Sequence, residues 1–281
     1  MRIAIVYDAI YPYVTGGAER RYYEIGRRLA ARGHEVRFVG WRWWEGASLA
    51  RRPDGTWVEG VGAPPALHDA DGRRTFREAA TFAARAVPAI ARIDADVIEC
   101  SSIPYAPAIA LAPVAKVRGI PLVVSWHEYM GGRWTEYAGA RAPIASAIER
   151  QAARAGGVRV AVSDFTASRL PGGPRTIVAP NGVDCDASAL VAPEKSADVV
   201  VAGRLVPHKR VHLLLQAMQH APGITAAIVG DGPDRPRLET YAARLGVADR
   251  VQFLGRVESD ERVAALIKGA RCVLVASEQE G

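Results

Sequence analysis

Two cations in residues 199–215, VVVAGRLVPHKRVHLLL, have the types and spacing expected of an anion-binding turn. A short apolar run ends at Gly203, Arg204 and Lys209 follow in the loop, and apolar residues at helical spacing come next. Open α/β sheets bind anionic ligands at such turns, beyond the carboxyl ends of their strands. The fork of Arg204 and the point charge of Lys209 therefore predict a diphosphate site, with two solvated surface cations as the alternative.

His127 is the histidine best placed for chemistry. It directly follows an apolar run at residues 122–126 that predicts a strand, and the ends of such strands line ligand crevices. A neutral imidazole there can donate or accept one well-aimed hydrogen bond, and Glu128 beside it can orient or charge the ring. A structural histidine that caps the strand is the alternative.

Glycines stand at two further turns between a predicted strand and a predicted helix. Gly16 and Gly17 precede a helix that begins near residue 18, and Gly230 and Gly232 lie in GDGPDRPRLE before another helix. Backbone amides and the positive end of a helix can approach a phosphate, a sugar or a base at these turns. Ordinary glycine turns are the alternative at both places.

The first helix is strongly basic, and a loop near residue 41 is rich in tryptophan. The arginines of this helix predict a solvated face, with contact to an anionic acceptor or a lipid headgroup as the alternative: Arg20, Arg21, Arg27 and Arg28. The loop holds three tryptophans, Trp41, Trp43 and Trp44. We expect them to pack against the domain, in preference to stacking on a sugar or inserting at a membrane interface.

Composition limits the class of protein. The chain has 281 residues and a net charge of +6, which suits one large or two ordinary domains and is compatible with phosphorylated substrates. No Lys/Arg block or motif predicts nucleic-acid binding. Cys100, Cys185 and Cys272 are far apart, which predicts reduced thiols in a cytoplasmic protein. The chain enters its first strand at once, so no signal peptide is expected, and no apolar run is long enough to span a bilayer.

Strands and helices alternate along the whole chain, which predicts an α/β fold with parallel sheets. The second predicted helix, residues 73–92, should break at Pro88, and the glycine-rich segment 129–137 should be mobile and able to touch an acceptor. Residues 184–197 lose periodicity and predict a domain boundary. The expected domains are residues 1–190 and residues 197–281.

Several motifs, in order and over the whole chain, resemble the retaining glycosyltransferases of family 4. In the first part these are TGGAER, VVSWHEY and APNGVD; in the second they are VAGRLVPHK, IVGDGPDRPRLE, VQFLGRV and VLVASEQEG. The resemblance implies the GT-B fold, in which two Rossmann-like parallel-sheet domains face a cleft. It implies transfer of a sugar from a nucleotide-sugar donor with retention of the anomeric configuration and without a metal ion.

The resemblance also implies roles for single residues. Arg204 and Lys209 correspond to the pair that neutralises the donor diphosphate, and fixed cations there would stabilise the leaving-group charge as it forms. His127 corresponds to the histidine near the transferred sugar. Gly16 and Gly17 correspond to the loop of the first domain that faces the donor phosphates and the acceptor. The other glycines correspond to backbone that borders the donor: Gly203, Gly230 and Gly232. Glu280 corresponds to the first glutamate of an E-x7-E motif that contacts the donor sugar.

The end of the chain departs from the family pattern. Gly281 directly follows Glu280, so the second glutamate of the motif, which binds the ribose in the family, has no counterpart. We therefore expect the second domain to be incomplete and the chain to be a fragment, or a truncated reading frame, of a longer enzyme. Such a chain should bind its donor weakly or not at all.

Other functions remain open at the level of sequence. A sugar-nucleotide epimerase of the GT-B type or a non-catalytic sugar-binding chain are the main alternatives. A nicotinamide-dependent dehydrogenase ranks low, because no glycine fingerprint follows the first strand. The donor base, either UDP- or GDP-linked by expectation, is not fixed, and the acceptor is a glycan, a lipid or a small molecule. The expected location is the cytoplasm, with peripheral contact at the inner membrane face left open.

Overall fold

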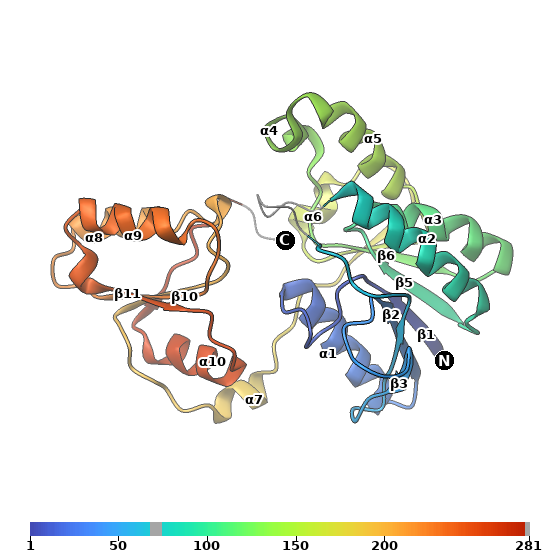
Figure 1. The fold of residues 1–281 in the computed structure, drawn as a ribbon, viewed down its shortest axis with the longest axis horizontal. Helices are drawn as coiled ribbons and strands as arrows, with labels where there is room; N and C mark the ends of the chain where they lie inside the picture. The colour runs from blue at the N-terminus through green and yellow to red at the C-terminus, as the bar shows by residue number, and fades with distance from the viewer. Residues whose placement is uncertain (68–74, 279–281) are drawn as a thin grey trace. The chain divides into compact units, whose positions relative to one another are not determined.

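The computed structural model describes residues 1–67 and 75–278. The chain divides into two compact units (Figure 1), of which unit 1 is Met1–Gly182 and unit 2 begins at Val183. Each unit has its own sheet and its own buried core.

Unit 1 is built on an eight-stranded sheet of order β3-β4-β2-β1-β5-β6-β7-β8. Neighbouring strands are parallel except for the pair β3 and β4. The strands are β1 (Arg2–Val6), β2 (Glu35–Gly40), β3 (Leu49–Arg51), β4 (Trp57–Gly60), β5 (Val97–Ser101), β6 (Leu122–Trp126), β7 (Val158–Ala161) and β8 (Arg175–Val178).

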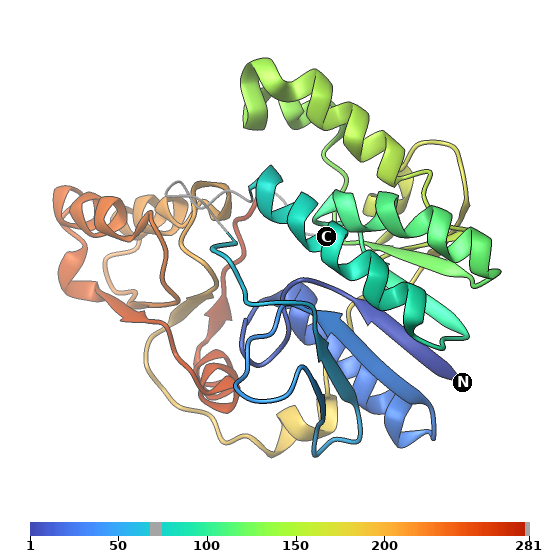
Figure 2. The ribbon, with the colours of Figure 1, turned by 45° about the vertical axis from the view of Figure 1, so that its right-hand side comes forward.

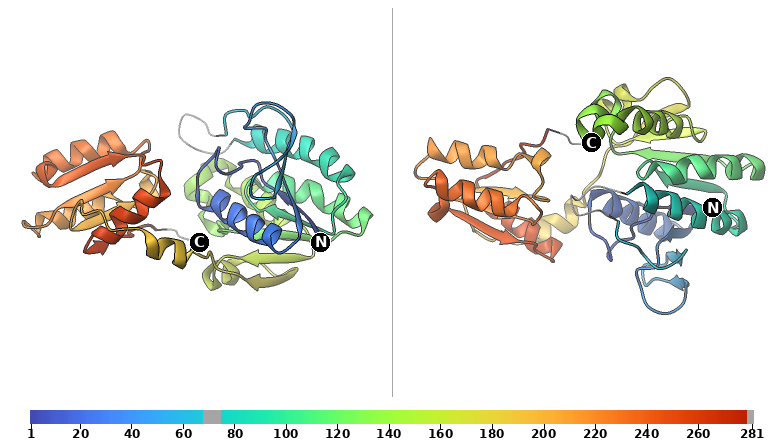
Figure 3. Two further views of the ribbon diagram at one scale, coloured as in Figure 1. Left: turned by 90° about the horizontal axis from the view of Figure 1, so that it is seen from below. Right: turned by 45° about the horizontal axis from the view of Figure 1, so that its top comes forward.

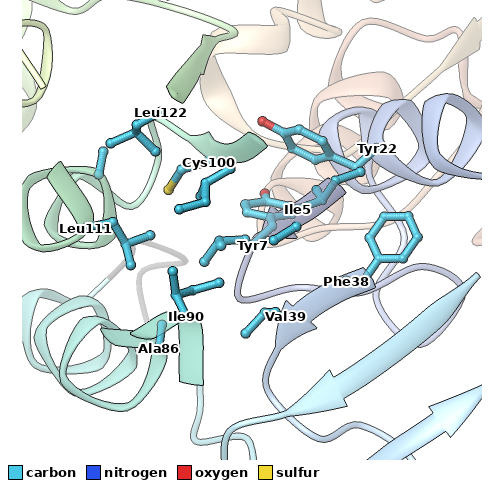
Figure 4. Packing of buried hydrophobic residues seen from close by; sticks show 14 of the residues in the cluster. Ile5, Tyr7, Tyr22, Phe38, Val39, Ala86, Ile90, Cys100, Leu111 and Leu122 are labelled. Atoms are coloured by element: carbon cyan, nitrogen blue, oxygen red, sulfur yellow. The ribbon is translucent and has the colours of Figure 1, made fainter. Parts of the chain in front are cut away.

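Helices cover both faces of this sheet, with α1 on one face and α2 and α3 on the other (Figures 1 and 2). The helices of unit 1 are α1 (Gly17–Ala31), α2 (Phe76–Arg92), α3 (Tyr105–Arg118), α4 (Trp134–Ala138), α5 (Ala142–Ala152) and α6 (Asp164–Arg169), with 3-10 turns η1 (Gly131–Arg133) and η2 (Gly139–Arg141). The central strands are apolar because they are covered on both sides. Figure 4 shows Tyr22 of α1 near Ile5 of β1 and near Tyr7, which directly follows β1, within this core.

Unit 2 is a smaller parallel sheet of order β11-β10-β9-β12. Its elements are α7 (Cys185–Leu190), β9 (Val199–Ala202), η3 (Pro207–Lys209), α8 (His212–Gln219), β10 (Ala226–Val229), α9 (Arg235–Arg244), η4 (Ala248–Arg250), β11 (Val251–Gly255), α10 (Asp260–Gly269) and β12 (Cys272–Val273). One core packs the sheet against α8 and α9, and a second core packs its other face against α10 (Figure 3).

The structure departs from the sequence-based predictions at two places in unit 1. Helix α2 continues through Pro88 without a break. Proline removes the hydrogen bond to the carbonyl four residues earlier, and both Pro88 and Ala84 lie on the exposed side, where water can satisfy that carbonyl. The glycine-rich segment at residues 129–137, for which no helix was predicted, is folded for the most part into η1 and α4.

Two further elements were missing from the sequence interpretation. Strand β3 is only three residues long and pairs with β4 as the antiparallel edge strand of the sheet. It is too short to show the alternation of apolar and polar residues that predicts a strand. Helix α7 lies inside the segment assigned to the domain boundary, where the side chain of Asp184 caps it by accepting from the amide of Ala187 at 3.0 Å.

The tryptophans pack against unit 1 as predicted. The indole N–H groups of Trp41, Trp43 and Trp44 all donate within unit 1, and that of buried Trp41 reaches Glu78 Oε1 at 2.8 Å. The three cysteines are free thiols, and burial raises the pKa of the Cys100 thiol. Among residues 1–67 and 75–278, no helix combines the length and the apolar character needed to cross a bilayer.

Candidate functional site

His127 lies at the carboxyl end of β6, where it faces helix α1. Its ring meets the ring of Tyr22 edge-on, with the centroids 6.0 Å apart. Its Nε2 atom is buried and has no hydrogen-bond partner within the described part of the chain. Its backbone carbonyl accepts from Thr166 Oγ1 at 3.4 Å. A buried nitrogen that is left unpaired costs free energy unless a ligand or water completes it, which marks this position as a candidate site.

The surroundings of His127 keep its ring neutral. Burial, followed by the positive charge of Arg21, lowers its pKa from 6.5 to about 4. The sequence offered Glu128 as a group that can orient or charge the imidazole, whereas the charge that shifts the pKa of His127 in the structure is that of Arg21 on α1. A neutral imidazole is available as a hydrogen-bond donor or acceptor over the whole physiological pH range.

Arg21 has a different role from the other arginines of α1. Its Nη1 donates to Asn181 Oδ1 at 2.8 Å, and its buried Nε has no partner in the described residues. Arg27 and Arg28 instead pair with Glu24 on the helix surface. The predicted solvated face is thus correct for those two, while Arg21 joins α1 to the PNGVD loop beside His127.

The glycine pair before α1 stands next to a carboxylate. Gly16 is the N-cap residue of α1, and a Cβ placed on it would lie 2.3 Å from Glu19 Oε2. Glu19 is almost fully buried and accepts from Tyr7 Oη at 3.2 Å. Its negative charge therefore occupies the positive end of the helix, which favours a sugar hydroxyl over a phosphate at Gly16 and Gly17.

A second carboxylate, Glu99 on β5, lies under the same helix. Its Oε1 accepts from Ser125 Oγ of β6 at 2.7 Å. Burial raises the pKa of Glu99, while Ser125 and Arg21 act against that rise. Burial and then the charge of Glu99 raise the pKa of Tyr22. Sequence reasoning missed this group, although an acidic residue inside the apolar run VIECS was a usable signal.

In unit 2 the turn between β9 and α8 carries the two predicted cations. Gly203 follows β9, Arg204 is exposed, and Lys209 ends the short η3 turn before α8. The part of the chain that the structure describes gives Arg204 no carboxylate partner. The backbone of this turn is held from within, because Lys209 N donates to Val206 O at 3.0 Å.

The other predicted glycines lie in a turn that packs directly on this one. Leu205 N donates to Asp231 O at 2.9 Å, which joins the turns after β9 and β10. A Cβ on Gly230 would lie 1.9 Å from Gly203 O, and one on Gly232 would lie 2.3 Å from Leu205 O. These glycines are therefore required by the close approach of two backbones, and the structure brings Gly203, Gly230 and Gly232 together.

Glu280, the remaining predicted site residue, lies outside the described residues. Within residues 1–67 and 75–278, no group of three or more His, Cys, Asp or Glu side chains is arranged to hold a metal ion. The predicted residues thus form two groups: His127 with Gly16 and Gly17 in unit 1, and the two joined turns in unit 2.

The amino-acid sequence of this chain is similar to two known family models and to several known proteins. The model described as Glycosyltransferase Family 4 matches residues 15–187, and that described as Glycosyl transferases group 1 matches residues 186–281. A GDP-mannose-dependent alpha-(1-6)-phosphatidylinositol monomannoside mannosyltransferase of Mycolicibacterium smegmatis is 31% identical over 179 residues, which cover 56% of this chain and 44% of the relative. A D-inositol 3-phosphate glycosyltransferase of Mycobacteroides abscessus is 39% identical over 87 residues, which cover 29% of this chain and 19% of the relative. The match thus spans less than half the length of either relative.

Solved structures share the fold at lower identity. Sucrose-phosphate synthase from Thermosynechococcus elongatus superposes with a TM-score of 0.76 at 17% identity, over 99% of this chain and 76% of that one. Anabaena Alr3699/HepE in complex with UDP and glucose gives a TM-score of 0.69 at 22% identity, over 99% of this chain and 74% of that one. These likenesses confirm the predicted α/β fold of the GT-B type.

Proposed function

Because the chain belongs to glycosyltransferase family 4, we propose that it transfers a sugar from a nucleotide-sugar donor to a hydroxyl of an acceptor. The acceptor is a glycan, a lipid or a small molecule. The relatives named above act on a phosphatidylinositol monomannoside and on an inositol phosphate, which supports a hydroxyl-rich acceptor.

The observation that carries this proposal is the pair of joined turns in unit 2. They place Arg204 and Lys209 beyond the carboxyl end of β9 in a parallel sheet, the position at which open α/β folds bind phosphorylated ligands. When the bond to the sugar breaks, a nucleoside diphosphate departs with added negative charge. Fixed cations at that oxygen stabilise the charge where it forms, and they cost no reorganisation during the reaction.

His127 supplies the complementary group in unit 1. Its neutral ring and unpaired Nε2 suit a hydrogen bond to a sugar hydroxyl, and its neutrality avoids placing another cation beside Arg21. The carboxylates of Glu19 on α1 and Glu99 on β5 suit hydroxyl groups better than a phosphate.

We propose a UDP- or GDP-linked donor. The mycobacterial mannosyltransferases support GDP-mannose by their higher identity, while Alr3699/HepE, a more distant structure, was determined with UDP and UDP-glucose. Retention of the anomeric configuration and independence of metal ions are part of the proposal, because two fixed cations take the place of a metal at the diphosphate. We place the reaction in the cytoplasm, with peripheral contact at the inner membrane face as the alternative.

Release of nucleoside diphosphate from a panel of UDP-, GDP- and ADP-sugars tests the proposal, with acceptors that include mannosides and inositol. We expect release from one donor only, unchanged in EDTA, and a product whose one-bond C1–H1 coupling in NMR indicates the same anomeric configuration as the donor sugar. Release that requires a divalent cation would contradict the proposed metal independence, and a product of inverted configuration would contradict retention. Conversion of the donor sugar without any acceptor would favour an epimerase.

A further inference from the structure

The segment that follows His127 is held in place on both sides of its backbone. It runs from Tyr129 through η1 into α4 and contains two adjacent glycines, Gly131 and Gly132. Gly131 has a positive φ of 54°, a conformation that side chains with a Cβ adopt at a cost. A segment of this composition needs outside contacts to keep one conformation, and two residues of unit 1 provide them.

The first is Glu149 of α5, whose carboxylate is fully buried. Its Oε1 accepts from Met130 N at 2.7 Å and from Tyr105 Oη at 2.8 Å. Its Oε2 accepts from Gly131 N at 2.8 Å and from Trp134 Nε1 at 2.9 Å. Four donors converge on one acceptor-only group, and hydrogen bonds to a charged group are the strong ones.

The second is Arg169 of α6, which binds the carbonyls of the same segment. Its Nε donates to Tyr129 O at 3.1 Å and its Nη2 donates to Met130 O at 3.2 Å. Thr166 of the same helix donates to the carbonyl of His127. A carboxylate thus holds two consecutive amides while a guanidinium holds two consecutive carbonyls of the same stretch.

We propose that Glu149 and Arg169 are positioning residues that hold the backbone after β6 and thereby fix the ring of His127 against Tyr22. Three of the four donors to Glu149 belong to this segment, so the buried charge is placed to order it. The consequence for function rests on the role proposed for His127, whereas the ordering of the segment does not.

The direct test is hydrogen exchange on Glu149→Gln. In the variant, the NH₂ group of glutamine replaces one carboxylate oxygen and faces two hydrogen-bond donors. The two hydrogen bonds to that oxygen are therefore lost, and the two to the other oxygen weaken because the acceptor is no longer charged. We expect exchange at Met130 and Gly131 to accelerate roughly tenfold to a hundredfold. Tyr105→Phe is the matched control, since it removes one donor from Glu149 and none from the segment. In Tyr105→Phe, hydrogen exchange at the amides of Met130 and Gly131 should be as slow as in the parent protein.

A second readout separates positioning from mere stability. If the segment loosens, water reaches His127 and its pKa should rise from about 4 toward 6.5, which NMR titration of the ring reports. Tyr105→Phe should leave that titration unchanged even if it lowers the melting temperature. Arg169→Gln removes the donors to the two carbonyls and should raise the pKa of His127 in the same way. Arg169→Lys retains one donor group for these carbonyls, so the pKa of His127 should rise less.

The outcomes are distinct. Unchanged exchange and an unchanged His127 titration in both Glu149→Gln and Arg169→Gln would overturn the proposal. Should Glu149→Gln fail to fold, Arg169→Gln decides alone, because Arg169 is partly exposed and its removal leaves no buried charge. Neither readout uses a sugar donor, so failure of the proposed transferase activity would leave this result standing, and the reverse also holds.

Discussion

At the residue scale, the structure separates groups that the sequence presents as equivalent. Four arginines lie on α1, yet only Arg21 is shown to contact Asn181 and to act on His127. The Nε2 atom of His127 is buried, has no partner among the described residues and belongs to a ring that meets an aromatic ring. The chemistry of the candidate site therefore depends on burial, which a list of residue types does not contain.

The lowered pKa of His127 predicts a loss of stability in mild acid. Its folded pKa of about 4 lies below the unfolded value of about 6.5, so the unfolded state binds the extra proton first as the pH falls. Between these values the free energy of unfolding should decrease, by up to about 3 kcal/mol in total at about 1.4 kcal/mol per unit. Below pH 4 this contribution stays constant.

Denaturant unfolding of the parent protein and His127→Gln, from pH 8 to pH 4, measures that loss. As the pH falls below 6.5, the free energy of unfolding of the parent protein should decrease relative to that of His127→Gln. Because the other titrating groups are the same in both, a difference that does not vary with pH would contradict the neutral, buried ring.

At the element scale, the two glycine turns of unit 2 form a structural joint. The amide of Leu205 and the carbonyl of Asp231 connect them, and the missing Cβ atoms of Gly230 and Gly232 allow the approach. The turn that carries Arg204 and Lys209 is thus fixed by backbone contact with the turn after β10, which gives the proposed diphosphate site a rigid base.

Gly230→Ala should destabilise unit 2, because its Cβ would lie 1.9 Å from Gly203 O and its φ of 135° is unfavourable for alanine. We expect a cost of about 1–3 kcal/mol, and each kcal/mol lowers the melting temperature by roughly 4–8 °C in a unit of this size. Calorimetry of this variant beside Gly223→Ala, whose Cβ would meet nothing within 4 Å, measures the effect. Equal melting temperatures for the two variants would show that the joint is not needed.

How far the sequence predicts these elements follows from the range of the contacts involved. Most strands and helices were predictable, because apolar runs and the spacing of Leu214, Leu215 and Met218 reflect local burial. The fold of residues 129–138 was not, since it depends on Glu149, which lies more than ten residues away in sequence. The pairing of Glu99 with Ser125 was likewise hidden, because it arises from the register of β5 and β6.

At the scale of the whole molecule, the chain between the units belongs structurally to unit 2. Helix α7 is tied to α10 by Lys268, whose Nζ donates to the carbonyls of Ser188, Ala189 and Val191. Glu194 N also donates to Ala265 O at 2.9 Å. A cation on the last carbonyls of a helix is favourable, and here it fixes the connecting segment to one of the two folded bodies.

Lys268→Met should release this segment, because the substitution keeps the aliphatic stem and removes the donor to three carbonyls. We expect faster hydrogen exchange in residues 185–191 with little change in the core of unit 2. Lys195→Met, at an exposed position of the same segment, is the control. If both variants exchange alike, Lys268 does not anchor α7.

The most direct test of the central claim is a thermal-shift series of the chain with UDP, GDP and ADP. A ligand that binds only the folded state raises the melting temperature by mass action. At a hundredfold excess of ligand over its Kd, the free energy of unfolding increases by about 2.7 kcal/mol. We predict stabilisation by one nucleotide, absent in Arg204→Ala and Lys209→Ala, and retained in Lys116→Ala at an exposed position of α3. Stabilisation that survives in both Arg204→Ala and Lys209→Ala, or its absence with all three nucleotides, would contradict a diphosphate site between β9 and α8.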